Sequence, residues 1–295
     1  MRIIDRILIL AALVLFGHAV AERARDYWRP PPLRPRTEAP VRPVDDIGEP
    51  APRRLPPGYI ALPPAASQDP TLDVAPTQAR RPSQRSVGTA FAVGRDGATW
   101  LTARHVIDHC ATVQVLAAGW ATPVDVTFTH QTADIAVLHA PGQGPPLPVT
   151  EGPLGYGENG YAFGIAGEGG PSGIQATLLG RARLQQSGRM TGMTEVTVWA
   201  ERAWVPPGER WIGGMSGGPL LTSEGNVAGL MSVASQRRGR IFTVAPETIV
   251  TVMRARRIGF VPPTAAPVAI SPDALEPSRN TLLNRRSIVQ LLCTA

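Results

Sequence analysis

The stretch GMSGGPL, residues 214–220, surrounds one serine with three glycines and a proline. The residues that follow read as β-strand, and glycine inside a strand usually marks a bulge or a place where another group approaches the backbone closely. A serine at such a place is a candidate nucleophile. Ser216 is therefore the residue around which the rest of the sequence is interpreted.

Short runs of β-forming residues occupy the chain from 85 to 257. They are rich in Val, Thr, Ala and aromatic residues, and Gly, Pro, Asp or Asn separates them at intervals of roughly ten residues. The runs fall into two series, 86–140 and 160–245, which predicts an all-β domain built as two small barrels or a sandwich. One helix is expected at 246–257, because Pro246 stands near its start and arginines stand near its end.

Two further residues supply what a serine nucleophile needs. A serine hydroxyl is almost fully protonated at neutral pH, so it needs a base within about 2.6–3.2 Å. His105, in LTARHV, is the candidate base. Its other ring nitrogen must donate to a fixed acceptor, and a carboxylate there also stabilises the imidazolium that forms. Asp134 fits this role, because it opens the apolar run IAVLHA and should lie on a buried strand.

Four motifs resemble, in the right order, the signature stretches of the chymotrypsin/trypsin-like serine proteases. They are GTAFAV (88–93), LTARHV (101–106), ADIAVL (133–138) and GMSGGPL (214–220). The chain order His, Asp, Ser is also that of the family. The resemblance covers about residues 85–257. It implies two small antiparallel β-barrels with the active site between them and a C-terminal helix, and a serine endopeptidase that forms an acyl-enzyme and needs no cofactor or metal.

The same resemblance implies further roles around the nucleophile. The backbone N–H groups of Gly214 and Ser216 would form the oxyanion hole, which stabilises negative charge on the former carbonyl oxygen. Arg210, six residues before the nucleophile, would lie at the base of the primary specificity pocket and disfavour basic side chains. Three residues match the strand that pairs with the substrate backbone by adding a strand to the sheet edge: Ser232, Val233 and Ala234.

The residue before the nucleophile bears on activation. In zymogen-forming relatives it is an aspartate, which pairs with a new N-terminal ammonium after cleavage and so orders the oxyanion turn. Met215 cannot make that ion pair. We therefore expect a turn that is preformed, or one that is ordered by packing of Met215, by substrate, or by another part of the chain.

Two other functions remain as alternatives. One is a catalytically silent relative that binds extended peptides, and the other is an envelope interaction protein that acts through its Pro-rich arm and its tail. The complete set of triad residues favours the peptidase, with a polypeptide substrate. Nucleic acid is not expected as a partner, because the net charge of +6 is spread along the chain. A zinc site around His105, Asp108, His109 and Cys110 is disfavoured, because no second ligand pair has finger-like spacing.

The N-terminal residues 1–21 are typical of a secretory signal. Arg2 and Arg6 precede an apolar run that ends at Gly17, and small residues lead up to Ala21. The apolar run is shorter than the roughly 20 residues that span a membrane. We favour cleavage after Ala21 over a retained anchor, and we expect membrane contact only if the segment is kept. Either way the protein is exported, to the periplasm or the cell envelope.

The remaining segments flank the barrel region. Residues 22–84 hold 15 of the 31 prolines, so they are expected to form a disordered linker without helix or strand pairing. Residues 258–295 are expected to be a C-terminal tail that can include a short helix. Cys110 and Cys293 either form a disulfide that clips this tail to the first barrel, or remain two free thiols.

Overall fold

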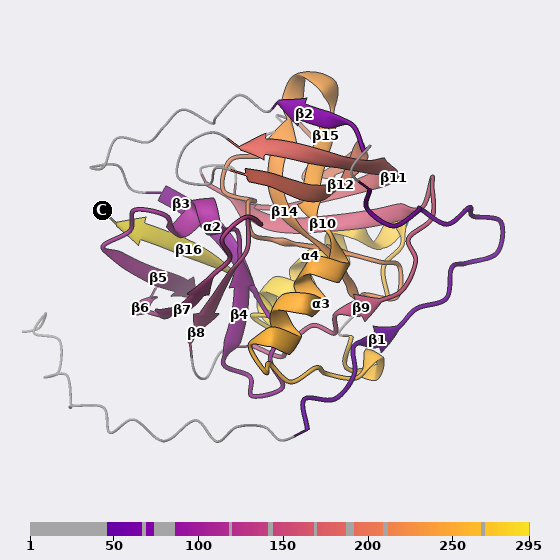
Figure 1. Cartoon of the computed structure of the whole chain (residues 1–295). Coiled ribbons are helices and arrows are strands. Elements are labelled where there is room, and N and C mark those ends of the chain that lie inside the picture. Colours follow the sequence, from indigo (N-terminus) through magenta and orange to yellow (C-terminus); the bar gives the residue numbers. More distant parts are fainter. Residues whose placement is uncertain are drawn as a thin grey trace, which may run out of the picture. The chain divides into compact units, whose positions relative to one another are not determined.

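Two curled antiparallel sheets form the core of the computed structural model, which describes residues 46–66, 69–73, 86–117, 120–140, 144–167, 170–186, 192–208, 212–266 and 269–294. Most strands of each sheet come from one of the two predicted series. In Figure 1 the magenta strands of the first sheet lie to the left, and the rose and orange strands of the second lie above and to the right. The predicted all-β fold with two small barrels and a C-terminal helix is confirmed.

The first sheet is a curled half-barrel whose strands lie in the order β6, β5, β16, β3, β4, β8, β7. Its centre is filled by large side chains such as Phe91, Trp100 and Leu138, all fully buried. The Trp100 indole N–H donates to the Ala140 carbonyl, so its polar group is satisfied. The strands are β3 (Ser86–Ala92), β4 (Thr99–Thr102), β5 (Thr112–Ala117), β6 (Trp120–Pro123), β7 (Asp125–Thr129), β8 (Ala136–His139) and β16 (Ile288–Thr294).

The second sheet closes into a six-strand barrel, because β10 pairs with β13 on one side and with β11 on the other. Closure pairs each of these strands with a neighbour on both sides over part of its length. Inside it, the buried Trp199 indole donates to the hydroxyls of Thr197 and Thr243. The strands are β10 (Asn159–Ala166), β11 (Gly170–Gln186), β12 (Gly192–Val205), β13 (Pro219–Leu221), β14 (Val227–Ser235) and β15 (Arg240–Val244).

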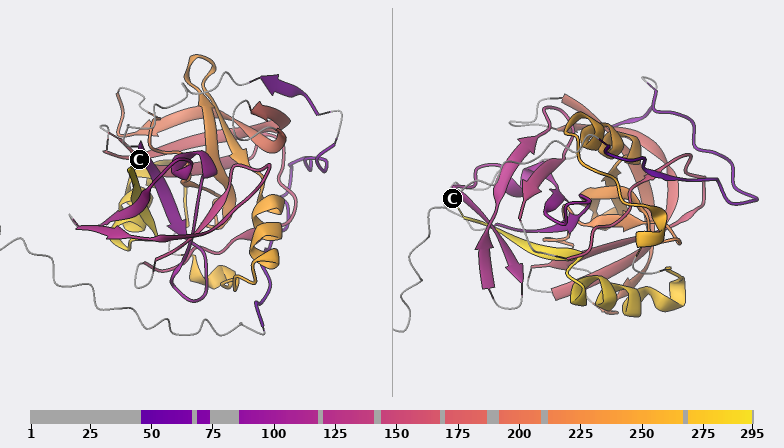
Figure 2. Two further views of the ribbon diagram at one scale, coloured as in Figure 1. Left: turned by 60° about the vertical axis from the view of Figure 1, so that its left-hand side comes forward. Right: turned by 90° about the horizontal axis from the view of Figure 1, so that it is seen from below.

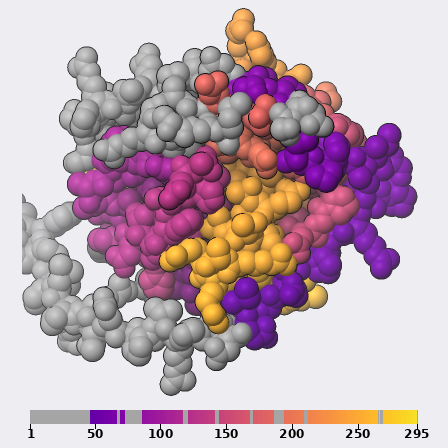
Figure 3. All heavy atoms as spheres, viewed as in Figure 1, coloured from indigo at the N-terminus to yellow at the C-terminus, as the bar shows by residue number. Residues whose placement is uncertain are grey.

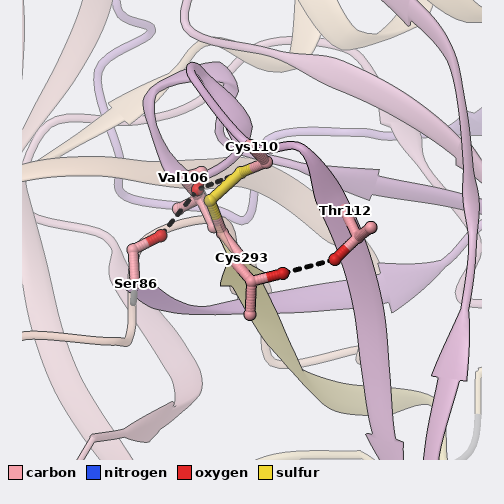
Figure 4. Close-up of a disulfide and its surroundings, with 6 residues drawn as sticks. Ser86, Val106, Cys110, Thr112 and Cys293 are labelled. Carbon is pink, nitrogen blue, oxygen red and sulfur yellow. Dashed lines mark hydrogen bonds between the residues drawn. A yellow bond between two sulfur atoms is a disulfide. The ribbon is translucent and has the colours of Figure 1, made fainter. Parts of the chain in front are cut away.

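The last strand of the predicted tail, β16, belongs to the first sheet. After α4 (Leu275–Asn284), β16 lies between β3 and β5 and pairs with both. The right-hand view of Figure 2 shows this yellow strand among the magenta ones. Of the two alternatives for the cysteines, the structure has the disulfide: Cys110, in the turn after α2 (Arg104–Ile107), is bonded to Cys293 on β16, with a Cα–Cα distance of 5.3 Å (Figure 4).

Two short parts of the predicted linker pair with later strands of the chain. The short strand β1 (Ala51–Pro52) runs parallel to β9 (Thr150–Glu151), and β2 (Thr71–Asp73) adds to the outer edge of β11. The expectation of no strand pairing is therefore wrong for these residues. Local composition disfavours a strand here, but the chain buries Leu62 against the barrel and the Leu62 N–H donates to the Leu154 carbonyl. In Figure 3 the indigo atoms of this segment lie against rose and orange ones.

The predicted helix at 246–257 is α3 (Pro246–Ala255), with Pro246 in its first turn and Arg254 in its last. Its buried residues Ile249, Val250 and Met253 lie on one face, as expected for an amphipathic helix. No helix in the described ranges is long and apolar enough to cross a membrane. The predicted signal at 1–21 lies outside them. The remaining helices are α2 (Arg104–Ile107), η1 (Gln236–Arg238), η2 (Pro263–Ala265) and η3 (Pro272–Ala274).

Candidate active site

The three candidate catalytic residues come from both sheets. His105 lies in α2, directly after β4, and Asp134 lies just before β8, so both belong to the half-barrel. Ser216 lies in the turn before β13 of the closed barrel. A short chain of contacts joins them: His105 contacts Asp134, Asp134 contacts Ser232, and the Ser232 carbonyl contacts Ser216. The structure thus brings the predicted residues together where the two sheets meet.

Two hydrogen bonds connect His105 and Asp134. The His105 Nδ1 atom lies 2.7 Å from Asp134 Oδ2, and the His105 backbone N–H donates to Asp134 Oδ1 at 2.9 Å. The Asp134 side chain is fully buried, whereas that of His105 is 42% exposed. A carboxylate at Nδ1 holds the proton on that nitrogen, which leaves Nε2 as the basic atom of the neutral ring.

The environment of Asp134 keeps its carboxyl group ionised. Complete burial by itself would raise the pKa, but the charge of His105 and the hydrogen bonds from His105 and Ser232 outweigh this effect. The pKa of Asp134 is therefore lowered from its usual value. An ionised Asp134 can orient the imidazole and stabilise its protonated form.

Ser232 has a contact that the sequence analysis did not foresee. It was predicted only as part of the substrate strand, but its Oγ atom also donates to Asp134 Oδ2 at 2.5 Å. The side chain is almost completely buried on β14. One signal was present in the sequence, since a serine inside the apolar run GLMSVAS must find a polar partner if the strand is buried.

The Ser216 hydroxyl is directed to the closed barrel in this structure. Its Oγ atom donates to the Ser232 carbonyl oxygen, at a distance of 3.3 Å. A hydroxyl has one hydrogen to donate, so transfer of the Ser216 proton to His105 requires the hydroxyl to rotate toward Nε2. Catalytic hydrogen bonds are often long or poorly aligned without substrate and tighten when it binds.

The turn before Ser216 requires glycine at position 214. Gly214 has a φ of +100°, and a Cβ atom there would lie 2.6 Å from the Gly167 nitrogen and 2.8 Å from the Ile165 oxygen. This explains why glycine occupies the position. Within the described residues, neither the Gly214 nor the Ser216 N–H donates to an acceptor, so both can bind a developing oxyanion.

Met215 is fully buried and belongs to the core of the closed barrel. Its N–H donates to the Ile212 carbonyl and its own carbonyl accepts from Gly218, so the turn is hydrogen-bonded on both sides of the methionine. Packing of Met215, one of the expected ways of ordering this turn without an ion pair, is therefore present in the structure.

The predicted substrate strand has one paired and one unpaired edge. On one side β14 pairs with β15 as far as Ser235, and on the other its ladder with β13 ends at Leu230. Beyond the Met231 contacts with 217–218, the described residues offer no strand partner on that side. Val233 and Ala234 are half-buried. Arg210, predicted at the base of the specificity pocket, lies outside the described residues.

Two side chains that were not predicted from the sequence, Arg104 and His130, fix the loop before Asp134. Arg104 Nη1 donates to the carbonyls of His130 and Gln131, at 2.7 and 2.9 Å. His130 Nδ1 accepts the N–H groups of residues 132–133. The pKa of His130 is lowered mainly by desolvation of the ring and, to a smaller extent, by the nearby charge of Arg104. A neutral His130 is thus part of the support of Asp134.

Comparison with known proteins agrees with this geometry. Residues 88–230 match the family model of the trypsin-like peptidase domain, a range that holds the three candidate catalytic residues. The chain therefore contains a trypsin-like peptidase domain. With this domain it is a serine endopeptidase.

Solved structures of proteases are similar to this chain. The active form of the Rv3671c protease from M. tuberculosis has 20% sequence identity to this chain and a TM-score of 0.50, over 68% of this chain and 96% of that one. The HtrA-type protease AlgW with a decapeptide has 18% identity and a TM-score of 0.44, over 57% of this chain and 50% of that one. At such identities the likeness concerns the fold alone. The sequence comparison with curated proteins gave no match.

Proposed function

We propose that the protein is an exported serine endopeptidase that hydrolyses peptide bonds through His105, Asp134 and Ser216 and an acyl-enzyme intermediate. The observation that carries the proposal is the pair of hydrogen bonds between His105 and Asp134. In this pair a buried, ionised carboxylate faces Nδ1 of a half-exposed imidazole. Such a pair has no need of a metal or cofactor to act as a base.

The proposed reaction proceeds in two halves. Nε2 of His105 takes the Ser216 proton as Oγ attacks the substrate carbonyl carbon, and the N–H groups of Gly214 and Ser216 stabilise the oxyanion. The protonated imidazole then gives its proton to the leaving amine as the C–N bond breaks, which leaves an acyl group on Ser216. Water, deprotonated by His105, attacks the ester carbonyl and releases the acid, and the proton returns to Ser216.

An extended polypeptide is the substrate that fits the unpaired edge of β14. We propose that its backbone pairs with Ser232, Val233 and Ala234 by adding a strand to the sheet. A substrate N–H that donates to the Ser232 carbonyl competes with the Ser216 hydroxyl for that acceptor. Substrate binding would thereby release Ser216 to rotate toward His105.

Export is supported by two features of the chain. Residues 1–21 have the pattern of a secretory signal. The Cys110–Cys293 disulfide is of the kind that forms and persists in oxidising compartments such as the periplasm.

The test is labelling by a fluorophosphonate probe, which reacts only with an activated serine, together with cleavage of an unfolded polypeptide. We expect the wild type to be labelled and active, and Ser216→Ala and His105→Ala each to lose both properties by at least about 10³-fold while keeping their fold. The matched control is His109→Asn: His109 is exposed four residues after His105, and asparagine tolerates its positive φ. Labelling of Ser216→Ala at the wild-type rate would exclude the assignment, and a wild type that binds peptide without being labelled would favour the silent relative.

A further inference from the structure

The turn that carries Gly214 is held from the other sheet by one buried threonine. Thr89, on β3 of the half-barrel, is fully buried. Its N–H donates to the Ser216 carbonyl at 2.9 Å, and its Oγ1 atom donates to the Gly214 carbonyl at 2.8 Å. The sequence GTAFAV was identified above only as one of the family-like motifs, and neither contact of Thr89 has a part in the proposed reaction.

The hydroxyl of Thr89 is fixed in direction by a second contact. The Ile165 N–H, on β10, donates to Oγ1 at 2.9 Å. With that lone pair occupied, the hydroxyl hydrogen points to the Gly214 carbonyl, which is its only acceptor among the described residues. A rotation of this peptide that turned the carbonyl away would leave a buried hydroxyl unsatisfied, which is unfavourable.

The peptide on the other side of Gly214 is anchored as well. The Gly167 N–H donates to the Gly213 carbonyl at 2.8 Å. Because a trans peptide holds its C=O and N–H on opposite sides, this contact sets the direction of the Gly214 N–H. The two anchored peptide planes together define φ and ψ of Gly214.

We propose that Thr89 is a positioning residue for the oxyanion hole, which it holds in its working conformation through the Gly214 carbonyl. The inference rests on the proposed function and adds to it how the hole is ordered without an aspartate before the nucleophile. The ordering group is a neutral hydroxyl supplied by the opposite sheet. Gly164 leaves room for it, since a Cβ atom there would lie 2.9 Å from Met215 Cα and 3.1 Å from Thr89 Oγ1.

The first test compares Thr89→Val, which keeps the shape of the side chain and removes the hydroxyl, with Thr89→Ser, which keeps the hydroxyl. We expect Thr89→Val to lower kcat about 10- to 100-fold with less than about a threefold change in KM. This loss is smaller than the roughly 10²–10³-fold cost of removing an oxyanion donor, because Gly167 still holds the neighbouring peptide. Thr89→Ser should restore kcat to within about threefold of the wild type.

The matched control is Thr150→Val. Thr150 is also a fully buried threonine whose hydroxyl donates to a backbone carbonyl, that of Ala51, on β9 away from the candidate site. It should leave kcat unchanged. If Thr89→Val does not fold, Thr89→Ala and Thr89→Ser form the comparison, and equal kcat values for these two would overturn the proposal.

Hydrogen exchange of the amides in 212–218 provides a readout that does not depend on activity. We expect faster exchange in Thr89→Val than in the wild type and in Thr150→Val, with Thr89→Ser close to the wild type. Unchanged exchange and unchanged kcat in Thr89→Val would overturn the positioning role of Thr89 but not the proposed function. A wild type that shows neither labelling nor cleavage would overturn the proposed function instead, and the exchange data would still decide whether Thr89 orders the turn.

Discussion

The closed barrel and the half-barrel satisfy their strand edges in different ways. The closed barrel is complete within residues 159–244, because β10 pairs with β11 and closes the circle. The half-barrel takes a strand from the far end of the chain, since β16 fills the position between β3 and β5. A disulfide across a sequence separation of 183 residues holds that strand to the turn after α2.

This difference matters for the candidate site because the two sheets contribute different parts of it. Asp134 and His105 belong to the half-barrel, whereas Ser216 and Ser232 belong to the closed barrel. Pairing over a long separation has a high loop-closure cost, so the half-barrel depends on a few distant links. We expect changes to those links to disturb the base and its carboxylate while the closed barrel persists.

Removal of β16 is expected to have the largest effect. A chain that ends at Arg286 loses the buried Ile288, Val289 and Leu291, the pairing on two sides and the disulfide. Loss of a buried aliphatic side chain costs about 2–5 kcal/mol, and a whole domain is stable by only about 5–15 kcal/mol. The half-barrel should therefore unfold and fluorophosphonate labelling of Ser216 should disappear, as measured by near-UV circular dichroism and probe uptake.

The control for this truncation is β2, which also comes from a segment distant in the sequence. β2 pairs with the outer edge of β11 over three residues. Replacing residues 71–73 by Gly-Ser-Gly should keep both the fold and the labelling. A truncated chain that is still labelled at the wild-type rate would show that the half-barrel does not need its distant strand.

Loss of the disulfide is expected to be the next largest effect. Cys110→Ser with Cys293→Ser removes a link that closes a very long loop, and such links contribute about 2–5 kcal/mol, chiefly by restricting the unfolded chain. We expect the melting temperature to fall by roughly 10 °C, with kcat at 25 °C within about threefold of the wild type. The fold should survive because two hydrogen bonds near the bridge remain. The Ser86 hydroxyl donates to the Val106 carbonyl (Figure 4), and the hydroxyls of Thr112 and Thr294 are hydrogen-bonded to each other. Equal melting temperatures for the wild type and the variant without the two cysteines would contradict the stabilising role of the disulfide.

The sequence predicted the parts of the site that depend on local chemistry. His105, Asp134, Ser216 and Gly214 could be placed because each has a residue type and neighbours that its chemistry demands. What it missed depends on pairing between distant segments. From its sequence, the run IVQLLCT could be either a strand or an unpaired chain end, and only its pairing with β3 and β5 makes it a strand. Likewise, the motif GTAFAV does not indicate that the Thr89 hydroxyl donates to the Gly214 carbonyl. Such contacts are set by the register of one sheet against the other, which no single stretch encodes.

The smallest expected effect is on the stability of the half-barrel in acid, and it arises from His130, which belongs to that sheet and not to the closed barrel. The pKa of His130 is lowered in the folded protein from 6.5, by desolvation and by Arg104, and the neutral ring accepts two backbone N–H groups of the loop before Asp134. The unfolded chain therefore takes up a proton at a higher pH than the folded one. Stability from this group is complete above about pH 6.5 and is lost as the pH falls through the lowered folded-state pKa.

His130→Asn tests this support of the half-barrel, because an asparagine side-chain oxygen can accept the same N–H groups and does not titrate. We expect its melting temperature to fall less than that of the wild type between pH 7 and pH 5, by a degree or so, because His130 is only partly buried. His139→Gln, on β8 of the same sheet, is the matched control and should follow the wild-type pH dependence. If His130→Asn follows it too, the acid sensitivity of the half-barrel does not come from the loop that carries Asp134.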